Sequence, residues 1–225
     1  MFPYPCIGQF RFLDLSIGLH PAYQEIVTRM KSGTQKYLDL GCCFGQDIRR
    51  LVKDGAPSEN CFGSDLRSDF MAMGYDLFLD KDTLKTEFIG ADVFDPSSGL
   101  KRLDGQMDII HTAAFFHLFS MEEQKTVARR VIQLLKPQKG SLLVGRQVGN
   151  VKGQEVPHRS NPNSHMFRHD VSTWKKMWKD IAEETGTQWD VQAELLDWPG
   201  LPGGSGPAEW QNQGVRRLTF SVRRM

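Results

Sequence analysis

One short stretch constrains the fold more than any other part of the chain. Residues 37–47 read Tyr-Leu-Asp-Leu-Gly-Cys-Cys-Phe-Gly-Gln-Asp, an apolar strand that ends in an acid and runs into a glycine turn. A helix is predicted directly after it, because Ile48, Leu51 and Val52 share one helical face and Gly55 stands where a helix stops. The glycines let the backbone approach a ligand, and a helix N-terminus favours a ligand with an anionic or polar end. The stretch therefore predicts a strand–turn–helix binding site.

Acidic residues end the strands that follow. A second apolar strand over residues 60–66 has Asp65 at its carboxyl end, and a third over residues 87–94 carries Asp92. A fourth strand is predicted over residues 107–111. An acid roughly 20 residues past such a turn is placed to bind a ribose diol, and parallel strands bind ligands at their carboxyl ends. Each acid alone fits a solvated loop, but their order and spacing favour a nucleotide-like ligand.

The remaining chain continues the alternation of helices and strands. Ser120 and Glu123 have the form of a capping box, which predicts a helix that stops near Pro137. Asp170 can cap another helix, which we expect to end at Gly186. Further strands are predicted over residues 141–148, 190–198 and 215–222, with a Gly/Pro-rich loop over residues 199–207.

This succession resembles the class I S-adenosylmethionine-dependent methyltransferases. Their first motif reads acid-x-Gly-x-Gly-x-Gly, and here Asp39, Gly41 and Gly45 match it while Cys43 replaces the middle glycine. The family's ribose-binding and adenine-contacting acids fall on Asp65 and Asp92. The resemblance implies S-adenosylmethionine as the cofactor and implies that it is bound by Asp39, Gly41, Cys43, Gly45, Asp65, Leu66, Asp92 and Val93.

The resemblance also implies the fold. We expect one Rossmann-like α/β domain over residues 1–225, with a seven-stranded, mostly parallel sheet and helices on both faces. The last strand should be antiparallel, in a hairpin at the edge of the sheet. A length of 225 residues suits one domain with a full core.

Three phrases narrow the resemblance to fungal secondary-metabolite methyltransferases of the meroterpenoid type. They lie at residues 4–15, 39–47 and 142–149. Some members of that group form methyl esters on meroterpenoid carboxylic acids. Members usually carry more helical turns before the first phrase, so the cap segment over residues 1–35 is short, and a truncated or alternative start is left open.

Basic and imidazole groups gather after the predicted fifth strand, in a long polar insert over residues 150–169. A structureless loop of this length is typically a lid over a site or a disordered segment. Arginine pairs bidentately with carboxylate, so we expect a substrate lid that orients an anionic acceptor. The alternative is a solvated loop without a specific role. The candidate acceptor residues are Arg146, His158, Arg159 and Arg168.

Two histidines lie near the end of the predicted fourth strand. His111 ends that strand, and His117 lies in the aromatic run Phe-Phe-His-Leu-Phe at residues 115–119. Either could act as a general base toward an acceptor hydroxyl, or could be a hydrogen-bonded histidine that shapes the pocket. We expect the shaping role for His111 and take His117 as the candidate catalytic residue. The phenylalanines fit a core or an apolar acceptor pocket equally well.

Composition points to a cytoplasmic enzyme without a nucleic-acid partner. The formal net charge is +1, which gives no strong field toward nucleic acid or anionic membranes. No apolar run reaches the roughly 18 residues of a membrane span, and Pro3, Pro5 and Arg11 interrupt any signal sequence. The 4 cysteines lack zinc-ligand spacing, so we expect reduced thiols and no metal. The oligomeric state stays open, with a homodimer as one option.

The chemistry expected first is oxygen methylation of a small molecule. No Asp/Asn/Ser-Pro-Pro-aromatic motif, which amino-methylating nucleic-acid enzymes carry, follows the fourth strand. A carboxylate acceptor is the first choice and a phenol or hydroxyl the alternative. The sequence also leaves open a cofactor-binding protein with little activity and a pure interaction module. A nicotinamide dehydrogenase is disfavoured, because the turn is Gly-x-x-x-Gly and no Tyr-x-x-x-Lys follows.

Overall fold

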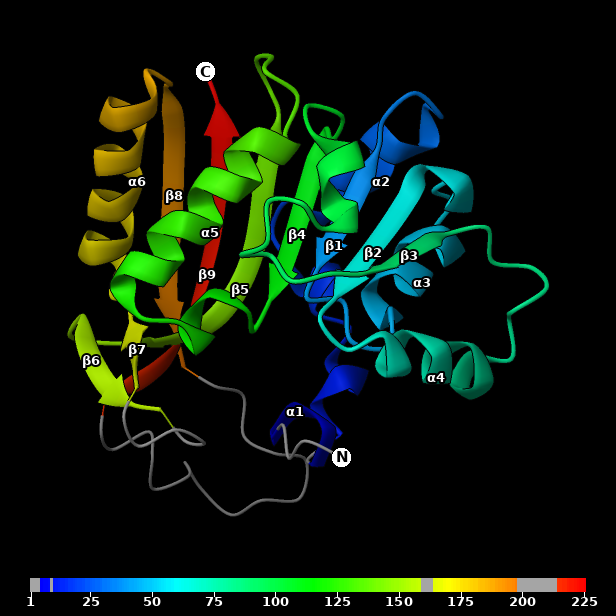
Figure 1. Cartoon of the computed structure of the whole chain (residues 1–225), viewed down its shortest axis with the longest axis horizontal. Coiled ribbons are helices and arrows are strands. Elements are labelled where there is room, and N and C mark those ends of the chain that lie inside the picture. The colour runs from blue at the N-terminus through cyan, green and yellow to red at the C-terminus, as the bar shows by residue number, and fades with distance from the viewer. Residues whose placement is uncertain (1–4, 9, 159–163, 198–213) are drawn as a thin grey trace.

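The protein folds around one twisted seven-stranded sheet (Figure 1). The computed structural model describes residues 5–8, 10–158, 164–197 and 214–225. Strand order across the sheet is β3-β2-β1-β4-β5-β9-β8. The strands are β1 (Tyr37–Leu40), β2 (Cys61–Asp65), β3 (Glu87–Gly90), β4 (Ile109–Ala113), β5 (Leu142–Asn150), β8 (Trp189–Leu196) and β9 (Val215–Arg224).

Strand β9 breaks the parallel arrangement of this sheet. β9 pairs antiparallel with both β5 and β8, whereas the pairs among β1 to β5 are all parallel. The expected mostly parallel sheet with an antiparallel last strand is confirmed. The expected hairpin of the last two strands lies at the edge of the sheet, with β8 outermost and β9 one strand inside it.

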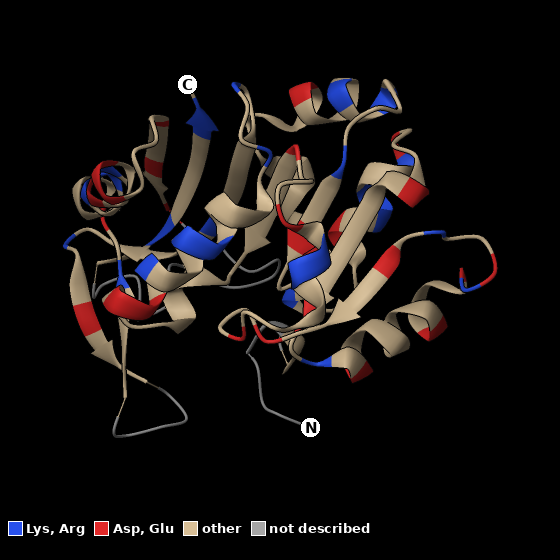
Figure 2. Ribbon diagram, turned by 45° about the horizontal axis from the view of Figure 1, so that its top comes forward, with Lys and Arg blue, Asp and Glu red and all other residues tan. Residues whose placement is uncertain are grey.

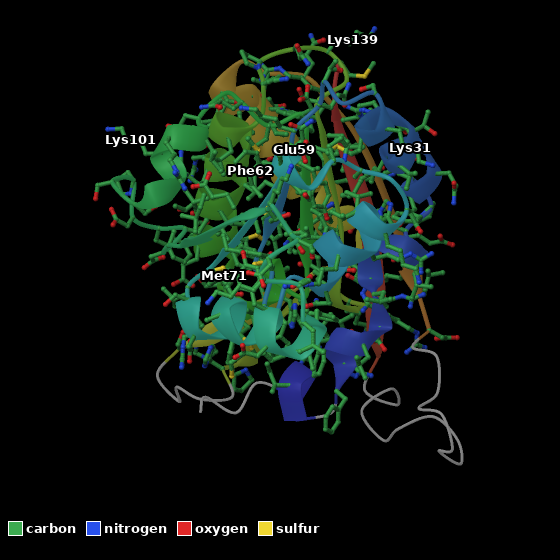
Figure 3. The ribbon with its side chains drawn as sticks, turned by 90° about the vertical axis from the view of Figure 1, so that its right-hand side faces the viewer. Lys31, Glu59, Phe62, Met71, Lys101 and Lys139 are labelled. Carbon is green, nitrogen blue, oxygen red and sulfur yellow. The ribbon has the colours of Figure 1, made fainter. Side chains whose placement is uncertain are left out.

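Helices cover both faces of the sheet. Figure 3 looks from the β3 edge, with α2 and Lys31 on one side of the sheet and η4 and Lys101 on the other. The α2, α3 and α4 face has its own core, and η4, α5 and α6 enclose a second core on the opposite face. The helices are α1 (Pro5–Gly8), η1 (Arg11–Asp14), η2 (Ser16–Leu19), α2 (Tyr23–Lys31), α3 (Gln46–Lys53), η3 (Ser58–Asn60), α4 (Ser68–Phe78), η4 (Gly99–Leu103), η5 (Phe116–Leu118), α5 (Met121–Leu134) and α6 (Val171–Thr185).

The predicted helix caps are confirmed. The Ser120 hydroxyl accepts from the Glu123 N–H, the Glu123 carboxylate accepts in return from the Ser120 N–H, and α5 begins one residue later. Asp170 caps α6 in the same reciprocal way with Thr173, and Gly186 ends that helix at φ 62°. Local side-chain bonds therefore set the ends of both long helices on this face.

The polar insert differs from the loop that its composition suggests. It contains an antiparallel hairpin of β6 (Gln154–Pro157) and β7 (His165–Arg168), which forms a separate two-stranded sheet. The expectation of a structureless loop is therefore wrong for the described part of the insert. A strand signal is weak there, because β6 is short and mostly exposed and ends in a proline. The Gly/Pro-rich loop expected over residues 199–207 lies outside the described residues.

Charges of both signs are spread over the helices and loops, as Figure 2 shows, in keeping with the net charge of +1. Within the described residues, no helix is both long enough and apolar enough to cross a bilayer.

Candidate functional site

The glycine turn after β1 repeatedly uses the left-handed backbone region. Gly41, Cys43 and Gly45 have φ of 80°, 52° and 71°. Cys43, which replaces the expected middle glycine, therefore adopts the conformation that a glycine would take easily. Its N–H donates to Asp65 Oδ2 at 2.9 Å, which helps to hold this conformation. The departure from the motif thus changes a side chain and leaves the path of the turn intact.

Asp65, at the end of β2, is held by backbone donors. Its Oδ2 accepts from the Cys43 N–H and its Oδ1 accepts from the Arg67 N–H, both at 2.9 Å. Burial raises the pKa of Asp65, and these two backbone bonds act in the opposite direction. Each carboxylate oxygen keeps a further lone pair for a ligand hydroxyl. Asp92 is held in a similar way, and its Oδ1 accepts from the Phe94 N–H at 2.9 Å.

A pocket of about 160 Å³ opens at the carboxyl ends of β1, β2 and β3. Five of the predicted cofactor residues line this pocket: Gly41, Asp65, Leu66, Asp92 and Val93. The turn alone did not reveal the pocket's other walls, which come from loops after β3 and β4. The acids at successive strand ends therefore do converge on one hollow, as parallel strands require.

Phenylalanines form the apolar wall of the pocket. Phe94 and Phe119 meet edge to face with ring centroids 5.1 Å apart, and Phe115 meets Phe119 at 5.3 Å. Leu66 leaves 64% of its surface exposed at the same pocket. An added Cβ at Gly41 would lie 2.5 Å from Phe115, so only glycine permits this packing. Apolar walls with two carboxylates fit a nucleoside, whose flat base is apolar on its faces and whose ribose offers hydroxyls.

Behind the turn lies a buried network of charged groups. His111 Nδ1 is 2.9 Å from Asp39 Oδ1, and His111 Nε2 is 3.5 Å from the Ser16 hydroxyl. Ser16 donates to Asp47 Oδ2 at 2.9 Å. Burial alone would lower the pKa of His111, but Asp39 and Asp47 raise it above its usual value. Both ring nitrogens lie close to these partners, and His111 does not line the pocket, so its expected pocket-shaping role stays a prediction.

This network anchors the N-terminal segment. The Ile17 N–H donates to Asp47 Oδ1 at 2.8 Å, and Phe12 packs edge to face on Phe44 of the turn with centroids 4.9 Å apart. Sequence reasoning missed Ser16 and Asp47. An acid at the first turn of α3 was visible, but nothing local pairs it with residues about 30 positions earlier.

Three residues of the network could in principle ligate a metal. Ligand atoms of Asp39, Asp47 and His111 lie within 4.8 Å of one another and all three residues are buried. Asp47 accepts from Ser16 and Ile17, and Asp39 Oδ1 lies within bonding distance of His111. We therefore interpret the cluster as an ion-pair network, in which Asp39 Oδ2 is a buried oxygen without a partner among the described residues.

The acceptor candidates do not gather at one point. Arg146 lies in the middle of β5, in register with Ala113, the last residue of β4. Arg168 pairs with Gln154 at one end of the β6–β7 hairpin, and His158 follows its other end. Those two are about 13 Å apart along the strands, at roughly 3.3 Å per residue. Arg159 lies outside the described residues, so its role stays a prediction, as do those of the other three.

His117 lies in η5, immediately after Phe116 on the way out of β4. The residue is half-buried, and Phe115 and Phe119 on either side of it line the pocket while His117 does not. Its assignment as a catalytic base stays a prediction. The neighbouring phenylalanines were expected to form either core or an apolar pocket wall, and both occur. Phe116 is fully buried in the core, and the other two form the pocket wall.

The fold and the site together define a class of protein. The combination of features resembles that of S-adenosylmethionine-dependent methyltransferases. It comprises a glycine turn, an acid at the end of β2, an acid after β3 and an antiparallel β9. Residues 38–138 match the family model described as a methyltransferase domain. A solved S-adenosylmethionine-dependent methyltransferase from Mesorhizobium loti shares the fold, with a TM-score of 0.59 and 16% identity over 92% of this chain and all of that one.

Sequence relatives place the chain more closely. The O-methyltransferase phiE of Fungal sp. is 42% identical over the whole chain, which covers 78% of that protein. The asnovolin E/chermesin D methyltransferase nvfJ of Aspergillus novofumigatus is 44% identical over 85% of the chain and is covered to 68%. The chain belongs to this family of S-adenosylmethionine-dependent methyltransferases of fungal secondary metabolism.

Proposed function

We propose that this cytoplasmic enzyme methylates an oxygen of a small secondary metabolite, and that the oxygen belongs to a carboxylate on a polyketide- or terpenoid-derived skeleton. The observation that carries the proposal is Arg146 in the middle of β5, in register with Ala113, the last residue of β4, whose following loop contributes Phe115 and Phe119 to the pocket. Its side chain is only 16% exposed, and its guanidinium offers five donors in a planar fork that matches a carboxylate. The name of phiE, an O-methyltransferase, supports transfer to oxygen.

The residues of the pocket suit S-adenosylmethionine. Asp65 would hold the ribose hydroxyls, and Asp92 with the apolar side chains of Leu66 and Val93 would hold the adenine. When bound, S-adenosylmethionine supplies a methyl group already activated on its sulfonium. The protein's own part is then to orient the acceptor oxygen and exclude water from the transfer.

A carboxylate acceptor simplifies the demands on the protein. Carboxylic acids with a pKa near 4 are ionised at neutral pH, so no side chain needs to remove a proton. Arg146 would orient the carboxylate, and the Phe115–Phe119 wall would contact the apolar skeleton. No general base is required for this acceptor, which leaves a catalytic role of His117 to the alternative below.

Methylation of a phenol is the alternative, with His117 as the general base. A phenol has a pKa near 10 and benefits from a base in the transfer step. This alternative predicts a rate that falls as the pH drops through the histidine pKa, and a large loss in His117→Ala. The carboxylate proposal predicts a maximum rate that stays nearly flat from about pH 6 to 9.

The decisive experiment is product analysis with a panel of polyketide and terpenoid acids that carry both a carboxyl and a phenol. The enzyme would be supplied with isotopically labelled S-adenosylmethionine, and the products treated with alkali. Release of the label as methanol identifies a methyl ester and supports the proposal. Label that resists alkali identifies an aryl ether and would end the carboxylate proposal.

A further inference from the structure

Arg146 is not free to meet an acceptor, because a carboxylate of this chain already contacts it. Asp14 Oδ2 lies 3.4 Å from Arg146 Nη2, across 132 positions of sequence. The contact is long and single, although a guanidinium and a carboxylate can form two short parallel bonds. The Asp14 side chain is 44% exposed, while that of Arg146 is mostly buried. The contact is therefore a weak one that solvent and ligands can reach from the Asp14 side.

The chain on both sides of Asp14 is fixed in place. Two residues before it, Phe12 packs on Phe44 of the glycine turn. Two and three residues after it, Ser16 and Ile17 bond to Asp47 at 2.9 and 2.8 Å. The short η1 helix that carries Asp14 thus cannot move away without breaking buried contacts. An incoming anion could displace the Asp14 side chain by rotating it into solvent, with the backbone left where it is.

The charges around Arg146 single out Asp14 as the exchangeable one. Asp14 and Asp47 are the nearby carboxylates that favour the charged guanidinium, and Arg217 opposes it. Asp47 is 1% exposed and occupied by bonds to the N-terminal segment, so it cannot leave. Of these two carboxylates, Asp14 is the one that combines proximity to Arg146 with exposure to solvent.

We propose that Asp14 determines acceptor specificity by occupying Arg146 as an internal carboxylate, which the carboxylate of the acceptor must displace. This inference rests on the proposed function of Arg146. A tethered group next to its partner has an effective concentration on the order of millimolar, so small carboxylates at lower concentration lose the competition. An acid with an apolar skeleton gains further contacts and displaces Asp14. The pair thus selects for acids whose apolar skeletons gain further contacts with the protein.

The test compares a small carboxylate with its neutral match. Benzoate and benzamide would be titrated calorimetrically into protein saturated with S-adenosylhomocysteine. Asp14→Asn keeps the shape of the side chain and removes its charge, so benzoate should bind about two- to fivefold more tightly, the range of an exposed ion pair. Benzamide affinity and S-adenosylhomocysteine affinity should not change. The matched control is Glu25→Gln, which removes another exposed carboxylate paired with an arginine, Arg223, and should leave benzoate binding as it was.

A double variant tests whether Asp14→Asn acts through Arg146 or indirectly. In an Arg146→Gln background, Asp14→Asn should have no effect on benzoate, because the site of competition is gone. An unchanged or weaker benzoate affinity in Asp14→Asn, or an equal gain for benzamide, would overturn the inference. Its failure is distinguishable from that of the proposed function: if methyl esters still form, only the role of Asp14 is lost, whereas alkali-stable products remove the carboxylate acceptor itself.

Discussion

The pocket that we propose for the cofactor (the cofactor half of the site) and the region of Arg146 that we propose for the acceptor (the acceptor half) are held together in different ways. Around the pocket, backbone N–H groups hold the key side chains: Asp65 accepts from Cys43 and Arg67, and Asp92 from Phe94. On the acceptor side, Arg146 makes a long side-chain contact to a segment far away in the sequence. Backbone donors survive most substitutions, whereas a side-chain pair is lost with either partner. The cofactor half is thus built to stay constant, and the acceptor half can change by single substitutions.

The largest effect should come from breaking the backbone of the cofactor half. In Gly45→Val, the new Cβ would lie 2.7 Å from Phe88 and 2.9 Å from the Arg49 guanidinium, at φ 71°. We expect a loss of about 2–5 kcal/mol in the free energy of unfolding, from left-handed strain plus crowding. S-adenosylhomocysteine binding should become undetectable by calorimetry. Gly33→Val is the control, because Gly33 has φ 74° and nothing within 4 Å, so it carries the strain alone. Unchanged ligand binding in Gly45→Val would mean that the turn is not the site.

Removing one charge from the cofactor half should be the next largest effect. Asp65→Ala loses a charge-assisted bond worth about 1.5–3 kcal/mol, a fall of about 10- to 150-fold in affinity for S-adenosylhomocysteine. Asp69→Ala is the control, since Asp69 is an exposed neighbour paired only with Arg67 among the described contacts. Calorimetry that finds equal affinities in the two variants would count against the pocket as the cofactor site.

Removing one charge from the acceptor half should weaken acceptor binding without weakening cofactor binding. Arg146→Gln should weaken binding of an acid acceptor about tenfold or more and leave S-adenosylhomocysteine affinity within about twofold. Steady-state kinetics and calorimetry measure the two effects. Arg129→Gln is a suitable control, because Arg129 pairs with Glu184 on the exposed surface of α5 and α6. A parallel loss of cofactor affinity in Arg146→Gln would show that the halves are not independent.

Acid should loosen the acceptor half through two buried histidines. Burial lowers the pKa of His20, next to η2, and of His169, at the end of the insert, from 6.5 to about 4 in each case. These two histidines therefore take up protons below about pH 6.5 in the unfolded chain, but only near pH 4 in the folded chain. The contribution of these two histidines to the free energy of unfolding should fall as the pH drops through this window, by about 3 kcal/mol for each histidine across the whole window.

Urea unfolding of the wild type and of His20→Gln and His169→Gln from about pH 4.5 to 7.5 would measure this pH dependence. Each variant should show a shallower pH dependence than the wild type. His165→Gln is the control, because His165 is exposed in β7. Parallel curves in all four proteins would contradict the assignment.

The smallest effect should come from restoring the glycine of the motif. Cys43→Gly removes left-handed strain of about 1 kcal/mol but adds flexibility to the unfolded chain, which costs about 0.4–1 kcal/mol. The two nearly cancel, so the free energy of unfolding should change by less than about 0.5 kcal/mol. The Cys43 N–H that Asp65 accepts from is also kept, so cofactor affinity should change little. A large change in either quantity would show that the thiol itself has a role.

The sequence predicts the cofactor half of the site better than the acceptor half. Asp65 and Asp92 could be placed at the pocket because each ends or follows an apolar strand, and parallel strands bring such ends to one edge. Asp39 lies within β1 and contacts His111 behind the turn instead. The caps at Ser120 and Asp170 were equally readable, since a capping box is a four-residue pattern. Local patterns of this kind predicted eight cofactor residues, of which five line the pocket.

Contacts between distant segments leave no such pattern. Asp14 and Arg146 are 132 positions apart, and no sequence pattern near either residue predicts their contact. The bonds of Ser16 to Asp47, and of His111 to Asp39, likewise exist only once the N-terminal segment lies against the turn. The β6–β7 hairpin was missed for a related reason, because short polar strands lack the alternation that marks a strand.

The position of β9 has a consequence for synthesis of the chain. β9 lies between β5 and β8 in the sheet. About 65 residues separate Asn150, at the end of β5, from Val215, at the start of β9. At about 5–20 residues per second, the ribosome needs about 3–13 seconds to cover that distance. During that time β5, which is 9 residues long, presents an open edge to other nascent chains. This protein should therefore depend on chaperones most in the interval between these two strands, and slow codons there would lengthen the exposure.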